Sequence, residues 1–226
     1  MFFTNIRSFF GILVLIIAFF GCGIENDLGQ KIDKKVSALG SNYAGFDTAT
    51  YPGTQAMQWL WNNTTLYHVG YYLGGSHYLG GRGNPSTWLA HYDDLRGMGW
   101  GLTPVYVGSQ SYSPPSRKTA AQGVLDAQNA VDLARNHSGS GFPSGSVLYL
   151  DLEGGTRFES DMIGYYQAWV QEVINEGYTP GVYCSYLNAP QLRTADARPV
   201  FWVVQVNEYR CGDFVSPITT YPSRDP

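Results

Sequence analysis

The sequence is poor in charged residues, which make up 14 % of its 226 positions. Basic residues number 14 against 18 acidic ones, so the formal net charge is −4 and the pI is near 5.5. Binding to DNA or RNA depends on basic side chains that neutralise phosphates. The chain has no basic stripe of this kind, and we predict no nucleic-acid partner.

Cysteine is scarce as well, with three residues in the chain. No Cys-x-x-Cys pair accompanies the four scattered histidines, which excludes the usual zinc-site spacings. We therefore predict neither a metal nor a cofactor. Cys184 and Cys211 could form a disulfide in an oxidising compartment or remain as buried thiols, and the sequence leaves both open.

A glycine-rich phosphate loop is missing where a dinucleotide-binding fold would place it. The first predicted strand, 44–47, is followed by Thr48-Ala49-Thr50 instead of a Gly-x-Gly pattern. The later run Gly80-Gly81-Arg82-Gly83 leads into a loop and not into the start of a helix. These features argue against dinucleotide binding.

The N-terminus has the pattern of an export signal. Arg7 precedes an uncharged apolar run, 9–20, which is short for a bilayer span. The segment Gly21-Cys22-Gly23 resembles a bacterial lipoprotein signal, in which Cys22 becomes the lipidated first residue, although Phe19 departs from the usual leucine. We predict a signal peptide over 1–22, a polar tether over 23–42 and attachment to the cell envelope. Ordinary secretion and an uncleaved anchor are the alternatives.

The remaining 43–226 segment is long enough for one sizeable core and is predicted to be a single, monomeric domain. Short apolar runs alternate with helical patterns along it, which predicts right-handed β-α units around a parallel sheet. The predicted strands cover 44–47, 67–73, 102–107, 147–150, 181–184 and 200–206, and the predicted helices cover 55–61, 85–96, 120–134 and 163–174.

Two arrangements of such a sheet are open, a doubly wound sheet and a TIM-type (β/α) barrel. In a barrel, polar residues at the carboxyl ends of the strands gather at one mouth. Six polar residues hold such positions: Asp47, Gln110, Asp151, Glu153, Ser185 and Gln205.

The most informative motif is Asp151-Leu152-Glu153, which ends the apolar run 147–150. Alternate residues of a strand point to the same face, so Asp151 and Glu153 share a face at a backbone separation of roughly 6–7 Å. Carboxylates at such a distance can divide acid and base work on a glycosidic bond. An acidic pair that caps the next helix or binds water is the alternative. Aromatic residues reach 15 %, a richness that suits sugar stacking as well as core packing.

A series of motifs along 43–206 resembles a known family. It comprises Gly45-Phe46-Asp47-Thr48, Gly70-Tyr71-Tyr72-Leu73-Gly74-Gly75, the 104–110 segment, Gly123 with Asp126-Ala127, Leu150-Asp151-Leu152-Glu153, Gly181-Val182-Tyr183 and Phe201-Trp202-Val203-Val204-Gln205. The series resembles the bacterial glycoside hydrolase-like domain of the DUF1906 type, related to the lysozyme-like TIM barrels of glycoside hydrolase family 25. The resemblance implies an α/β barrel with its site at the carboxyl-end mouth.

The resemblance also implies roles for individual residues. Glu153 would be the general acid, Asp151 would stay ionised and orient a water or an N-acetyl group, and Asp47 would add a third carboxylate. Gln110, Ser185 and Gln205 would bind sugar, and Tyr72, Tyr183 and Trp202 would stack on it. Interior packing is the competing expectation for the aromatic residues, whereas Asp126 is expected to be structural.

The C-terminal segment, 207–226, departs from the family because the further strands that close related barrels are not recognisable in it. We therefore expect a barrel that is incomplete or closed by divergent segments. Three functions follow. The first is an exported hydrolase of peptidoglycan or a related amino-sugar polymer, the second is a catalytically silent glycan-binding lipoprotein, and the third is an envelope protein in which the barrel is only a scaffold.

Overall fold

The computed structural model describes residues 15–17, 44–76, 87–135, 141–153 and 157–204. The predicted signal peptide is described only at Leu15–Ile17. The tether, the lipidation residue Cys22, the predicted sugar-binding Gln205 and the second cysteine of the proposed pair, Cys211, lie outside the described residues.

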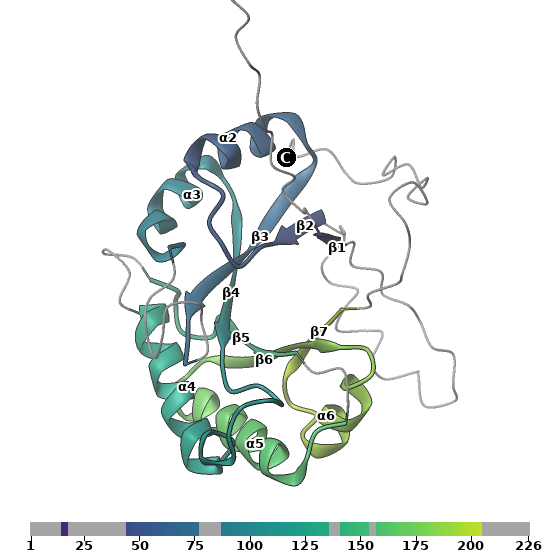
Figure 1. Cartoon of the computed structure of the whole chain (residues 1–226). Helices are drawn as coiled ribbons and strands as arrows, with labels where there is room; N and C mark the ends of the chain where they lie inside the picture. The colour runs from purple at the N-terminus through teal and green to yellow at the C-terminus, as the bar shows by residue number, and fades with distance from the viewer. Residues whose placement is uncertain (1–14, 18–43, 77–86, 136–140, 154–156, 205–226) are drawn as a thin grey trace, which may run out of the picture.

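Six parallel strands form one curled sheet, in which each strand lies beside the next one in the sequence (Figure 1). They are β2 (Ala44–Asp47), β3 (Leu66–Gly74), β4 (Gly101–Val107), β5 (Val147–Leu152), β6 (Thr179–Ser185) and β7 (Val200–Val204). A doubly wound sheet reverses its strand order at a switch point, whereas a barrel keeps the order of the sequence. The α/β fold of TIM type is therefore confirmed. Within the described residues no ladder joins β7 to β2, so the sheet is a half-barrel.

One further strand, β1 (Leu15–Ile17), pairs antiparallel with β2. It lies inside the segment that we predict to be a signal peptide. Removal of that peptide would leave the outer edge of β2 without this partner.

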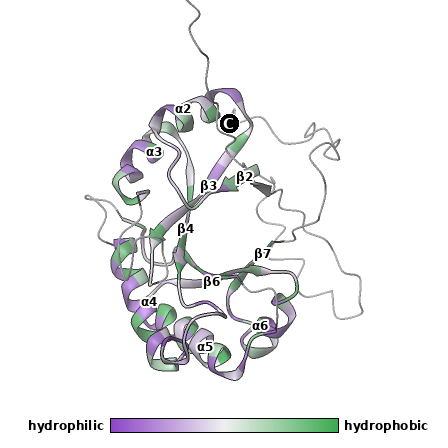
Figure 2. Ribbon diagram, viewed as in Figure 1, coloured by the Kyte–Doolittle hydropathy of each residue, from purple (hydrophilic) through white to green (hydrophobic). Residues whose placement is uncertain are grey.

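The helices follow one another around the outer side of the curled sheet (Figure 1). They are α2 (Thr54–Asn63), α3 (Tyr92–Met98), α4 (Ala120–Arg135), α5 (Ser160–Asn175) and α6 (Ala189–Ala195). Hydrophobic and hydrophilic residues alternate around these helices (Figure 2), which is the pattern of helices with one side against a core. The predicted helices of 55–61, 120–134 and 163–174 are confirmed, with ends that differ by a few residues.

Two local predictions were wrong. The helix predicted for 85–96 begins only at Tyr92, after a 3₁₀ turn at Leu89–His91. Trp88 explains the difference, because its buried indole N–H donates to the Thr48 carbonyl at 3.0 Å and so ties this segment to the loop after β2. Helix α6 was missed, because its seven residues are too few for a periodic signal.

The sheet curls far enough for its two sides to meet in the interior. Trp202 of β7 reaches Gly70 of β3, where an added Cβ would lie 3.6 Å from the indole. The same indole packs edge-on against Tyr149 of β5 and Tyr183 of β6, with ring centroids 5.6 and 4.9 Å apart. The same Cβ would lie only 2.7 Å from the Asp47 Cβ, so glycine at position 70 makes room for the aspartate that ends β2.

The layer between the sheet and the helices is mainly apolar, and α4 and α5 approach each other closely at Gly123. A Cβ at this position would lie 2.3 Å from the Tyr165 carbonyl oxygen, so only glycine permits the observed packing. Next to it, the buried Asp126 carboxylate accepts hydrogen bonds from Ser76, Gln122 and Tyr165 at 2.6–2.8 Å and a longer one from Tyr106 at 3.4 Å. These bonds support the structural role expected for Asp126.

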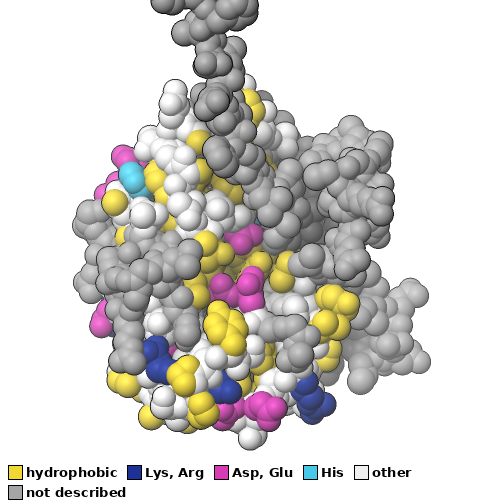
Figure 3. All heavy atoms as spheres, viewed as in Figure 1, with side chains coloured by type: hydrophobic (Ala, Val, Ile, Leu, Met, Phe, Trp, Pro, Cys, Tyr) yellow, Lys and Arg dark blue, Asp and Glu magenta, His cyan; other side chains and the backbone are white. Residues whose placement is uncertain are grey.

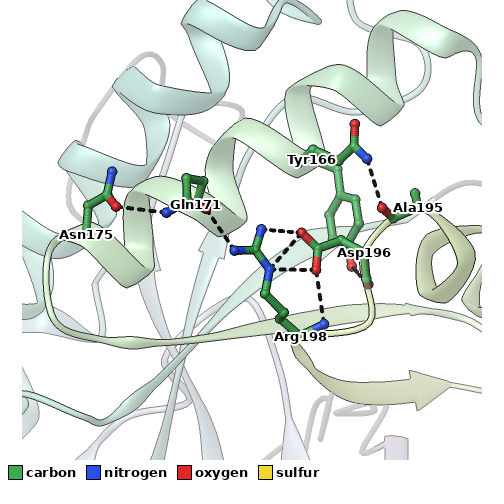
Figure 4. Close-up of polar contacts among 7 residues, drawn as sticks. Tyr166, Gln171, Asn175, Ala195, Asp196 and Arg198 are labelled. Atoms are coloured by element: carbon green, nitrogen blue, oxygen red, sulfur yellow. Dashed lines mark hydrogen bonds and ion pairs between the residues drawn. The ribbon is translucent and has the colours of Figure 1, made fainter.

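A surface network fixes the segment that leads into β7 (Figure 4). Arg198 donates to the Asp196 carboxylate, at 2.9 Å from its Nε, and to Gln171 of α5 at 2.8 Å. Tyr166 of α5 donates its hydroxyl to the Asp196 carbonyl at 3.0 Å. The network joins α5 to the end of α6 and so positions the last described strand.

Candidate active site

Three carboxyl groups meet at the carboxyl edge of the half-barrel. Asp47 ends β2, Asp151 lies near the end of β5, and Glu153 follows directly after β5. The strands are parallel, so these ends lie at one edge of the sheet. Mutual repulsion links the three groups, because Asp47 raises the pKa of both other carboxyls and Glu153 raises that of Asp151. On the face viewed in Figure 3, acidic side chains lie together in a hollow at its centre.

Asp151 is the most deeply buried member, with only 7 % of the residue exposed. Its Oδ1 has no hydrogen-bond partner among the described residues. Burial, then the charges of Glu153 and Asp47, raise the pKa of this carboxyl well above its usual range. This environment works against the ionised state that we predict for Asp151.

Asp47 has one partner that favours its charged form. The Tyr72 hydroxyl donates to Asp47 Oδ2 at 3.0 Å, whereas Oδ1 is buried without a partner in the described part of the chain. Burial raises the pKa of Asp47, and the Tyr72 hydrogen bond works in the opposite direction. Of the three carboxyls, Asp47 is thus the one whose negative charge receives a side-chain hydrogen bond.

Glu153 is the exposed member of the three. Partial burial and the nearby Asp47 charge raise the pKa of its carboxyl, so a larger fraction of it holds a proton near neutral pH than for a free glutamate. An exposed carboxyl with a raised pKa has the property required of a general acid. The acid role was assigned to this residue from the sequence, and its burial and charge environment are compatible with that role.

Gln110 holds the ends of β5 in place. Its amide nitrogen donates to the carbonyls of Asp151 at 2.8 Å and Gly108 at 3.3 Å, and its amide oxygen accepts the Glu153 backbone N–H at 3.0 Å. The side chain is buried. We predicted that Gln110 would bind sugar, but in this structure its amide is occupied by the backbone that carries the two β5 carboxyls.

The predicted stacking residues Tyr72, Tyr183 and Trp202 lie inside the curled sheet and are all buried. Burial, and then the charges of nearby carboxylates, raise the pKa of both tyrosine hydroxyls, so these phenols face the acidic group. Interior packing, the competing expectation, describes them better than stacking platforms do. Ser185, at the end of β6, is half-buried and donates to Asn188 Oδ1 at 2.7 Å.

Two further residues of the interior were not selected from the sequence. Tyr149 packs against Trp202, and burial raises the pKa of its phenol to about 12. His68 fills the space over Gly45, and burial lowers the pKa of its imidazole. The alternation of strand residues could have found both residues. Tyr149 points to the same face of β5 as Asp151, and His68 points to the same face of β3 as Tyr72.

The described residues contain no cluster of three or more His, Cys, Asp or Glu side chains that could hold a metal ion. Cys184 is buried and forms no disulfide with a described residue. No helix in the described part of the chain combines the length and apolar character of a membrane span.

Two hollows in the described part of the chain are lined by residues other than the three carboxyls. A cavity of about 230 Å³ lies between the loop after β4 and the start of α5. A larger, open groove of about 980 Å³ runs between α5 and the α6 region.

Solved structures with the same fold include an uncharacterized protein of B. stearothermophilus, which is 18 % identical, with a TM-score of 0.56 over 79 % of this chain and 82 % of that one. The Tat-secreted protein Rv2525c of Mycobacterium tuberculosis is 17 % identical, with a TM-score of 0.49 over 73 % of this chain and 81 % of that one. The catalytic domain of endolysin ply40 from the Listeria monocytogenes bacteriophage P40 is 15 % identical, with a TM-score of 0.47 over 73 % and 75 %. No curated protein gives a significant match.

A family model provides the assignment. The model of the Rv2525c-like, glycoside hydrolase-like domain matches residues 58–217, which include β3 to β7 and both carboxyls of the Asp151-Leu152-Glu153 motif. The resemblance inferred from the sequence motifs is thereby confirmed, and the chain belongs to the Rv2525c-like, glycoside hydrolase-like domain family.

Proposed function

We propose that the protein is an exported glycoside hydrolase that acts on peptidoglycan or a related amino-sugar polymer of the cell envelope, with Glu153 as general acid. The observation that carries the proposal is the exposed Glu153 carboxyl, whose pKa is raised beside two further carboxyls at the open edge of a glycoside hydrolase-like fold. Clusters of perturbed carboxyls of this kind are typical of catalytic sites.

The three carboxyls would divide the work according to their environments. Glu153 reaches solvent and would donate its proton to the substrate. Asp47, whose Oδ2 accepts the Tyr72 hydrogen bond, would carry the negative charge that stabilises an oxocarbenium-like transition state. Asp151, whose carboxyl pKa is raised by burial and by Glu153 and Asp47, would in its protonated form donate a hydrogen bond to an acetamido group or to the attacking water.

The reaction would consume one water for each bond that is cleaved. The Glu153 proton moves to the glycosidic oxygen as the bond from that oxygen to the anomeric carbon breaks, and the leaving sugar departs as an alcohol. A water molecule then forms the new bond to the anomeric carbon, and one of its protons returns to Glu153. The product is a new reducing end.

The proposal includes export of the protein and its attachment to a membrane. The predicted signal peptide over 1–22 would direct export, and lipidation of Cys22 would hold the domain at a membrane surface through the 23–42 tether. A domain anchored in this way would meet envelope glycan within the reach of the tether.

A catalytically silent glycan-binding protein is the second candidate, and one observation favours it. Asp151 is buried, and burial raises the pKa of its carboxyl, so this residue offers little accessible negative charge at the site. Such a mouth could bind a glycan without cleaving it.

Turnover separates the two candidates. Purified protein is incubated with peptidoglycan, and new reducing ends are counted for the wild type, Glu153→Gln and the control Asp132→Asn, which removes an exposed charge on α4. We expect Glu153→Gln to lower the rate about 10²–10⁴-fold, the usual contribution of a general acid, and Asp132→Asn to match the wild type. If the wild type releases no more ends than buffer but still pellets with the polymer, the binding candidate replaces the hydrolase.

A further inference from the structure

A small cavity beside the carboxyl cluster has a lining that suits a sugar ring. Its volume is about 230 Å³, below the 300–1,000 Å³ typical of sites for drug-sized ligands, so it admits one ring or a substituent. Seven residues line it: Ser111, Tyr112, Lys118, Arg157, Phe158, Glu159 and Met162.

The cavity is attached to the catalytic carboxyls through Gln110. The Gln110 side chain binds the Asp151 carbonyl and the Glu153 N–H, and the next two residues in the chain are Ser111 and Tyr112 of the cavity wall. On the opposite wall, Arg157 and Phe158 lie shortly after the end of β5. The cavity therefore lies at the same edge of the sheet as Glu153.

A fixed turn presents the Tyr112 ring. The Ser113 backbone N–H donates to the Gln110 carbonyl at 2.9 Å, and the Gln110 backbone N–H donates to Ser113 Oγ at 2.8 Å. Tyr112 lies within this turn and is 78 % exposed, the highest value among the exposed large hydrophobic residues described. A largely exposed aromatic ring beside a cavity offers its apolar surface to a ligand.

The floor of the cavity is apolar and rigid. Phe158 and Met162 are buried, and Gln191 of α6 holds the Phe158 backbone by accepting its N–H at 2.9 Å and donating to its carbonyl at 2.8 Å. A floor of this kind is preorganised, which lowers the cost of ordering a binding site.

The rim of the cavity is polar and nearly balanced in charge. Lys118 forms an ion pair with Asp161 at 3.2 Å, and Arg157 faces the same cavity as Glu159. Two cations and one anion line the cavity, and Asp161, which lies outside the lining, pairs with one of the cations, so the rim carries little net charge and offers many hydrogen-bond donors and acceptors. An apolar floor, an aromatic wall and a neutral, hydrogen-bonding rim match a pyranose ring, which has apolar faces and an equator of hydroxyl groups.

We propose that this cavity is a sugar-binding subsite, in which a pyranose ring of the glycan stacks on Tyr112 while a neighbouring part of the same chain lies over Glu153. The inference rests on the proposed function, since it assumes that the carboxyl-end mouth receives a glycan. Figure 3 shows hydrophobic side chains around the acidic hollow and basic side chains farther out on the same face. With this subsite, the protein would bind glycan chains of two or more sugars more tightly than a single sugar.

Binding of soluble β-1,4-linked N-acetylglucosamine oligomers tests the subsite. Calorimetric titrations use the di- and tetrasaccharide with Glu153→Gln protein, in which cleavage is blocked, and with the same protein carrying Tyr112→Ala, Tyr112→Phe or Trp59→Ala. Trp59 is the matched control, because it is an aromatic residue of α2 with 60 % exposure. We expect Tyr112→Ala to weaken tetrasaccharide binding about tenfold, and Tyr112→Phe and Trp59→Ala to leave it unchanged.

Turnover of the wild type and of Tyr112→Ala, Tyr112→Phe and Trp59→Ala, three variants that here keep Glu153, distinguishes the two proposals. If the wild type cleaves the glycan and Tyr112→Ala cleaves it with a higher KM, the result supports both the hydrolase and the subsite. If Tyr112→Ala changes neither cleavage nor binding, the subsite proposal is overturned and the hydrolase proposal stands. Binding that depends on Tyr112 without any cleavage keeps the subsite and overturns the hydrolase. A wild type that binds neither oligomer overturns the subsite together with the glycan function.

Discussion

Two buried aspartates, Asp126 and Asp151, lie on opposite sides of the same sheet and differ in how their oxygens are satisfied. Asp126, between the sheet and the helices, receives hydrogen bonds from four side chains. Asp151, at the open edge, has one oxygen without a partner among the described residues. Their residue exposures are similar, at 3 % and 7 %, so burial does not explain the contrast.

The contrast separates a carboxylate that stabilises the fold through hydrogen bonds from a carboxyl that is buried with one oxygen unbonded. Buried polar groups in native proteins are nearly always paired, because an unpaired group loses its hydration without compensation. An exception that persists next to two other carboxyls points to a chemical role. Each of the following predictions tests this reading at one residue.

Asp126→Ala should produce the largest effect, a loss of about 3 kcal/mol in the free energy of unfolding. The variant leaves the buried Tyr165 hydroxyl without its acceptor and also unpairs Ser76 and Gln122. Urea unfolding measures the loss, with Asp132→Ala as an exposed control on the same helix. A loss below about 1 kcal/mol would contradict the structural role of Asp126.

Gln110→Ala should have a smaller effect, a loss of about 2 kcal/mol. The variant removes the donor to the Asp151 carbonyl and the acceptor of the Glu153 N–H, so two backbone groups next to the site lose their partners. Thermal unfolding measures the loss, and Gln128→Ala, which removes an exposed glutamine, is the control. Equal stability of the two variants would show that Gln110 does not hold the end of β5.

Asp151→Asn should have the smallest effect and the opposite sign, a gain on the order of 1 kcal/mol at pH 7. The folded-state pKa of Asp151 is raised above its unfolded value of 3.8, so the folded protein binds the proton more tightly. The stability from this group is fully present below pH 3.8 and is lost as the pH rises through the folded pKa. Asparagine removes that loss.

Unfolding measured between pH 4 and pH 8 checks this sign. The advantage of Asp151→Asn over the wild type should shrink toward pH 4. If Asp151→Asn is less stable than the wild type at pH 7, then the carboxylate has a stabilising partner and the contrast with Asp126 fails.

Much of the fold could be predicted because its signals are local. The six strands are short, largely apolar runs, and the stripe of α4 keeps a helical period that buries Ala127, Val131 and Ala134. Helix α6 escaped because it is short, and the helix expected at 85–96 began late because the buried Trp88 ties its first turn to a distant loop. Such long-range contacts leave no periodic trace in the sequence.

The candidate site also has features that could be predicted from the sequence and features that could not. Alternation on one strand was enough to bring Asp151 and Glu153 to one face, and strand ends were enough to add Asp47. The division of labour among them was not predictable, because desolvation depends on what the rest of the chain packs around each group. The burial of the aromatic residues was not predictable either. Trp202 lies in the core because the sheet curls, and Tyr112, which was not selected from the sequence, is largely exposed.

The sequence by itself determined that this chain forms β-α units around a parallel sheet and that three acidic residues end its strands, since both follow from period and spacing along the backbone. Only the tertiary structure decided which carboxyl is exposed, which is buried and which aromatic ring faces solvent. Burial and electrostatic coupling arise from neighbours far apart in the chain, and these become neighbours only when the sheet curls.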